Sequence, residues 1–162
     1  MELASAPVGT VKVALAPTLP ASRRTAFAEH GGEAVVRQAI VDVFTERSHW
    51  DPSSSQVLQV TVTKFRLRST TNAFINGYFA GIDMLEGEAE LTMGSAAPGR
   101  YTFKLSGAEE QAFRYSSSAR LRSLAHLLAM ELANYIIPGG HGPTVGRVAP
   151  PAGGTQPMAA RY

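Results

Sequence analysis

Three glutamates alternate with small and apolar residues inside one short stretch, at Glu86, Glu88 and Glu90. Closely spaced carboxylates are the groups that bind divalent cations or share a proton in acid–base catalysis. Alternation places all three on one face of a strand, because successive side chains point to opposite faces. Lysine and arginine recur at alternate positions in the two strands expected to flank this one. We therefore interpret the glutamate row as a solvated, charge-paired sheet face.

The other residues that could do chemistry are isolated. The four histidines are His30, His49, His126 and His141, and none has a second ligand at a repeating helical spacing. We expect His126 on the outer face of a helix, and His49, beside Trp50 at a helix end, as an ordinary cation there. There is no cysteine, no nucleophile elbow and no phosphate-binding glycine loop. The sequence thus predicts no catalytic residue, no metal site, no cofactor and no enzyme.

One connection between predicted strands has an unusual composition. Ser69–Ile82 carries no charged residue but contains Phe74, Ile75, Tyr78 and Phe79. Connections normally run over the surface and are polar. These four side chains either close one end of the core or form an exposed patch that contacts a protein or a membrane. We interpret them as partner-binding residues, with a protein partner or a second copy of the chain as the expected contact.

Length and charge restrict the remaining functional classes. The 162 residues suit one domain, and 44% of them are hydrophobic, which is typical of a globular protein. The surplus of 15 basic over 13 acidic residues is accounted for by Arg147 and Arg161 near the C-terminus. The pairs Arg23–Arg24 and Arg120/Arg122 are interpreted as solvated helix ends. Because no basic cluster is present, we expect no nucleic-acid partner.

The elements that must position these residues follow from hydrophobic periodicity. Two segments have the apolar stripe of an amphipathic helix, Glu33–Arg47 and Ala119–Ile137, and Arg23–Glu29 is expected to form a helical turn. Four segments have the composition or alternation typical of strands: Val11–Pro17, Gln56–Arg68, Asp83–Met93 and Arg100–Leu105. In the second strand the alternation changes phase near Thr63–Lys64, which predicts a β-bulge.

These elements predict an α+β fold in the order β-α-β-β-β-α. An antiparallel sheet of three to four strands is covered on one face by the two amphipathic helices, because one-sided alternation requires a single buried face. We expect a flexible N-terminal arm over residues 1–10 and a single domain over 11–137. Five Pro and six Gly among residues 138–162 predict a disordered tail.

Two features of the sequence together form a recognisable pattern. The first is the element order, and the second is a pair of glycine-containing segments, Phe74-Ile-Asn-Gly-Tyr-Phe-Ala-Gly-Ile-Asp and Leu85-Glu-Gly-Glu-Ala-Glu-Leu. Between Val11 and Ile137 this pattern resembles small bacterial envelope lipoprotein domains of unassigned function. These are similar to the ABC-transport auxiliary lipoproteins and to the periplasmic domain of the curli-secretion lipoprotein. The resemblance implies export, a lipid anchor on an N-terminal cysteine, and a non-enzymatic role in assembly or transport. The sequence departs from it by lacking a signal peptide and that cysteine.

Three functional hypotheses remain open. The first is a non-enzymatic envelope module that contacts protein or lipid. It would lie in the periplasm or at the inner face of the outer membrane if a signal peptide and a lipidated cysteine precede Met1 in the native gene product, and in the cytoplasm otherwise. The second is a small-molecule-binding domain or an enzyme with a site between helices and sheet. The third is a cytoplasmic adaptor whose Pro-rich tail is a ligand for another domain.

Overall fold

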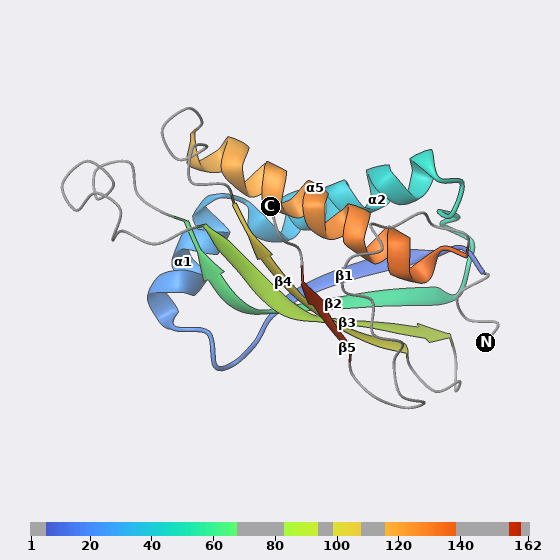
Figure 1. The fold of residues 1–162 in the computed structure, drawn as a ribbon, viewed down its shortest axis with the longest axis horizontal. Coiled ribbons are helices and arrows are strands. Elements are labelled where there is room, and N and C mark those ends of the chain that lie inside the picture. The colour runs from blue at the N-terminus through green and yellow to red at the C-terminus, as the bar shows by residue number, and fades with distance from the viewer. Residues whose placement is uncertain (1–5, 68–82, 94–98, 108–115, 139–155, 160–162) are drawn as a thin grey trace.

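The computed structural model describes residues 6–67, 83–93, 99–107, 116–138 and, for the backbone, 156–159. They form a mixed five-stranded sheet with the helices packed on one side (Figure 1). The predicted α+β class is confirmed. The elements in chain order are β1 (Thr10–Leu15), α1 (Ala21–Glu29), α2 (Gly32–Glu46), β2 (Gln56–Arg66), β3 (Met84–Met93), β4 (Gly99–Ser106), α5 (Ser117–Ile136) and β5 (Gln156–Ala159).

The strands lie in the order β1-β2-β3-β4-β5. The predicted antiparallel meander of β2, β3 and β4 is confirmed. β1 instead runs parallel to β2, with Val11 opposite Leu58, so the expectation of a wholly antiparallel sheet is wrong for this strand. The reason is the connection, because α1 and α2 return the chain across the sheet before β2 begins, and parallel neighbours require such a crossover.

The predicted β-bulge in β2 is present. Val62 pairs with Gly87 and Lys64 pairs with Glu86, so Thr63 is the extra residue. The insertion changes the phase of the strand and allows both Val62 and Phe65 to be buried. The charged side chains of β2 and β3 therefore stay on one face, which is the face opposite the helices.

The helices α2 and α5 pack on the other face of the sheet through the apolar stripes that the sequence predicts. Val36, Ile40 and Phe44 of α2 are each fully buried. Ser116 is the N-cap of α5, and its Oγ accepts a hydrogen bond of 3.2 Å from the backbone N–H of Ala119. The fully buried side chains contributed by α5 to the core include Leu121, Leu124, Leu128 and Leu132. α2 and α5 run in the same direction over the sheet (Figure 1).

Two glycines permit close packing that a larger residue would prevent. A Cβ at Gly32, the first residue of α2, would lie 2.5 Å from the ring of Phe27 in α1. That ring in turn contacts the ring of Phe65 in β2 edge-on, at 5.0 Å between centroids. In the sheet, a Cβ at Gly87 would lie 2.1 Å from the carbonyl oxygen of Thr61.

Both ends of the predicted domain extend further than expected. Val8, expected in a flexible arm, is fully buried and forms a bridge with Trp50. Within the segment expected to be a disordered tail, Gln156–Ala159 forms β5, which pairs in parallel with β4. The predictions for residues 1–5, 139–155 and 160–162 lie outside the described residues. Over the described ranges, no helix has the length and hydropathy needed to cross a bilayer.

Candidate functional site

The glutamate row lies on the open face of the sheet and is largely paired. The carboxylate of Glu86 lies between two lysines, 3.0 Å from Nζ of Lys64 and 3.4 Å from Nζ of Lys104. Glu90 accepts a hydrogen bond of 3.0 Å from Nε of Arg100. The cross-strand pairing that the sequence predicts is therefore confirmed for these two glutamates, and such pairs stabilise strand register.

The predicted partner-binding residues Phe74, Ile75, Tyr78 and Phe79 lie outside the described residues. The structure describes the residues on both sides of their segment. Leu67 precedes it and packs against the core, and Asp83 follows it and is buried. The surroundings of Asp83 therefore determine where this segment rejoins the sheet.

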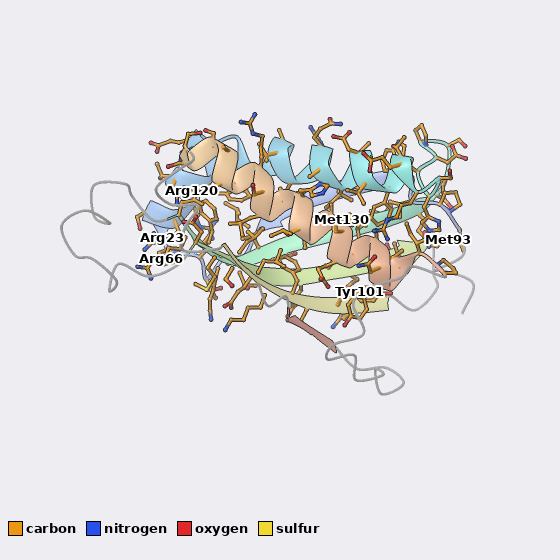
Figure 2. All side chains as sticks on the ribbon, turned by 45° about the horizontal axis from the view of Figure 1, so that its top comes forward. Arg23, Arg66, Met93, Tyr101, Arg120 and Met130 are labelled. Carbon is orange, nitrogen blue, oxygen red and sulfur yellow. The ribbon has the colours of Figure 1, made fainter. Side chains whose placement is uncertain are left out.

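Asp83 forms a buried ion pair with Arg120 in the first turn of α5. Nη1 of Arg120 donates to both carboxylate oxygens, at 2.6 Å to Oδ1 and 2.8 Å to Oδ2. The side chain of Asp83 is 3% exposed and that of Arg120 is 1% exposed. Figure 2 shows Arg120 at the end of the molecule where Arg23 of α1 and Arg66 of β2 also lie. We call this ion pair the Asp83–Arg120 anchor.

The anchor joins three segments of the chain. Nη2 of Arg120 donates to Oγ of Ser117 at 3.3 Å, within the first turn of α5. The backbone N–H of Gly107, just after β4, donates to the carbonyl oxygen of Asp83 at 3.0 Å. A Cβ at Gly107 would lie only 3.2 Å from Cβ of Asp83, so the chains approach closely here. The start of β3, the end of β4 and the start of α5 are thus fixed together.

The sequence interpretation of two arginines as solvated helix ends is wrong. Arg120 is 2% exposed, and Arg24 donates to the backbone carbonyls of Ala16 and Leu19 at 2.6 and 2.9 Å. One signal could have placed Arg120 inside. It lies four residues before Leu124, and residues four apart share a helix face, so it extends the row that ends in buried leucines.

The histidines differ in their environments. His126 is exposed on α5, as predicted. His49 is 6% exposed, so its interpretation as an ordinary cation at a helix end is wrong, because burial disfavours the charged imidazole. Its Nε2 has no hydrogen-bond partner among the described residues, and burial lowers the pKa of its imidazole. His141 lies outside the described residues. No group of three or more His, Asp or Glu in the described ranges is placed to hold a metal ion.

A groove of about 520 Å³ runs between α2 and α5 on the side away from the sheet. Its small or half-buried apolar residues are Ala34, Val35 and Ala39 of α2. Its polar residues are Arg37, Gln38 and Asp42 of α2 with Arg122 and His126 of α5. We call it the α2–α5 groove. Periodicity along the sequence does not reveal this groove, because its two sides come from helices far apart in the chain.

Comparison with known proteins gives structural likeness at low identity. No protein-family model matches the sequence, and no curated protein is similar to it at a significant level. Protein XCC0632 from Xanthomonas campestris, a DUF330 protein, aligns with 15% identity and a TM-score of 0.46 over 78% of this chain and 84% of that one. A dodecameric PelC variant from Paraburkholderia phytofirmans aligns with 16% identity and a TM-score of 0.45 over 83% and 94%. We draw no functional argument from alignments at these scores.

Proposed function

We propose that this protein is a non-enzymatic module of the bacterial cell envelope that acts in assembly or transport through contact with another protein chain. Segment 69–82 is the proposed contact surface, through Phe74, Ile75, Tyr78 and Phe79. The envelope assignment rests on the sequence resemblance, whose element order recurs in the fold with α1 and β5 added. The contact assignment rests on the chain's own residues.

The observation that carries the contact proposal is the Asp83–Arg120 anchor. Removing two charges from water is expensive, and a buried ion pair seldom adds net stability over apolar residues of similar size. Its presence is better explained by geometric specificity at this point of the chain. Asp83 is the residue at which segment 69–82 rejoins the sheet, and the contact of both its carboxylate oxygens with Nη1 of Arg120 fixes its position against α5. A contact segment whose end is already held in place loses less conformational entropy when it binds a partner.

The interior between helices and sheet favours this proposal over an internal ligand site. Side chains from both layers meet there and are fully buried, including Ile40 and Phe44 of α2, Leu58, Leu85 and Phe103 of the sheet, and Leu124 and Leu128 of α5. Ligand pockets of protein interiors are instead concave spaces of ~300–1,000 Å³ that bury most of the ligand. Among the residues that the structure describes, core side chains therefore occupy the region between helices and sheet that the second hypothesis requires.

The pairing of β5 bears on the adaptor hypothesis. A proline-rich ligand segment must be available as an extended chain for its receptor. Pro157 lies in β5 opposite Thr102 of β4, so this part of the tail is already engaged within the molecule. The contact proposal is therefore favoured over an adaptor role for residues 156–159.

Substitution of two aromatics tests the contact. The variant Phe74→Ser/Phe79→Ser should lose self-association or partner binding in sedimentation velocity, while its melting temperature stays near that of the unchanged protein. The matched control is Asn72→Ser/Asn76→Ser, which alters the same segment without removing apolar surface and should change neither measurement. A large loss of thermal stability with unchanged association would assign the two phenylalanines to the core and overturn the proposal.

Export is tested separately on the native gene. Alkaline phosphatase fused to the C-terminus of the native gene product folds into an active enzyme only after export from the cytoplasm. We expect high phosphatase activity with this fusion. An inactive but intact fusion would place the protein in the cytoplasm and remove the envelope assignment, while leaving the contact proposal to be judged by sedimentation.

A further inference from the structure

The arginines of the α2–α5 groove differ from the cations on the open face of the sheet. On the sheet face, Lys64, Lys104 and Arg100 each pair with a glutamate within 3.4 Å. In the groove, neither Arg37 nor Arg122 forms a hydrogen bond or an ion pair with any residue that the structure describes. The sheet-face cations are thus paired with carboxylates, whereas Arg37 and Arg122 form no such pair with the described residues.

The acid of the groove, Asp42, contacts a neutral neighbour instead of the arginines. Oδ1 of Asp42 accepts a hydrogen bond of 2.7 Å from Nε2 of Gln38, four residues earlier on the same helix. Asp42 forms no ion pair with either arginine among the described contacts. The two exposed guanidiniums outnumber the one carboxylate of Asp42, so the groove has a small net positive charge, and His126 lies beside Arg122 on the outer face of α5.

The shape of the groove fits a segment of protein. It lies between two helices that run in the same direction. The small apolar side chains of Ala34, Val35 and Ala39 line part of it. Grooves on proteins bind amphipathic helical segments through apolar side chains on one face of the segment. The groove is open to solvent along its helices, whereas small-molecule sites enclose most of their ligand. Arginine binds carboxylates through two parallel hydrogen bonds, which adds direction to the charge attraction.

We propose that the α2–α5 groove binds an acidic segment of a partner protein. Carboxylates of that segment pair with Arg37 and Arg122, and its small apolar side chains pack on Val35 and the two alanines. This inference goes beyond the proposed contact through segment 69–82, because it uses other residues on the outer face of the helix layer. The two contacts are independent, so either can fail without the other.

Peptide titration followed by NMR tests the groove. The probe is a short peptide of alternating alanine and glutamate, added to the isotope-labelled full chain at low salt. We expect shift changes confined to backbone signals of residues 34–42 and 122–126. The variant Arg37→Gln/Arg122→Gln should weaken binding by about tenfold, in line with the loss of two ion pairs at an exposed site. Both arginines are exposed, so the variant should keep its melting temperature.

Three controls decide the outcome. Arg23→Gln removes one exposed positive charge from α1, away from the groove, and should leave the affinity for the peptide unchanged. An alanine–lysine peptide of the same length should not bind. Absence of binding by the acidic peptide, or an equal loss of affinity in Arg23→Gln, would overturn the proposal. Binding of citrate at the same residues with the affinity of the peptide would identify a small-anion site and overturn the assignment to a protein segment.

Discussion

Replacing Asp83 with alanine should destabilise the protein far more than any substitution of a charged residue on the sheet face. The change leaves the guanidinium of Arg120 buried without its carboxylate, and this side chain is 1% exposed. Removing one member of a buried ion pair typically costs ~3–5 kcal/mol of unfolding free energy. A domain of this size has ~5–15 kcal/mol in total, so the loss should be a large fraction of the stability.

Urea denaturation followed by circular dichroism measures the effect. With a slope of ~2 kcal/mol per molar urea, the midpoint should fall by about 2 M. Glu90→Ala is the surface control, because its pair with Arg100 has side chains 37% and 60% exposed. Exposed pairs contribute at most ~1 kcal/mol, so this midpoint should move by less than about 0.5 M.

A double substitution separates the charges from the packing. Asp83→Leu/Arg120→Met removes both buried charges while keeping most of the volume, and such replacements are often neutral or stabilising. The double variant should therefore be more stable than Asp83→Ala. If Asp83→Ala destabilises no more than Glu90→Ala, then the anchor is not a buried ion pair in solution and the reasoning built on it fails.

Three further predictions test the core and the buried histidine. Leu128→Ala, in a fully buried position of α5, should cost about 2–5 kcal/mol in denaturation, whereas exposed His126→Ala should cost less than ~0.5, and the reverse order would mean that α5 is rotated. Gly87→Ala should destabilise by ~1–3 kcal/mol or more, because its Cβ would lie 2.1 Å from the carbonyl oxygen of Thr61. Burial lowers the pKa of His49, so its contribution to stability is present above the unfolded pKa of ~6.5 and is lost as the pH falls through the folded pKa. His49→Phe should therefore flatten the acid side of the stability profile, and an unchanged profile would show that this imidazole is not buried neutral.

Local patterns in the sequence were sufficient to predict most elements and the paired sheet face. The phase change near Thr63 predicted the bulge, because alternation of buried residues depends only on neighbours along one strand. The register that brings Lys64 and Lys104 to Glu86 follows from the same alternation in three consecutive strands. Such features depend on short-range order and need no knowledge of how layers pack.

Features that depend on long-range packing were missed. Asp83 and Arg120 are 37 residues apart, and their contact depends on where α5 begins relative to β3. The groove arginines likewise come from α2 and α5, so only the packing of those helices brings them together. The parallel direction of β1 follows from its connection to β2, which alternation within the strand does not encode. The strand β5 has only four residues, so its sequence gives a weak strand signal. The glycine and proline content of the surrounding tail predicted disorder there instead.

The most direct test of the central claim is photo-crosslinking from position 78 inside cells. Tyr78 is replaced by the photoreactive amino acid benzoylphenylalanine in the native gene product, and crosslinked species are identified by mass spectrometry after irradiation. The account predicts a discrete crosslinked product in which residue 78 is joined to a second protein chain, either another copy or a partner. Crosslinks confined to core residues of the same chain would contradict the claim that segment 69–82 is a contact surface.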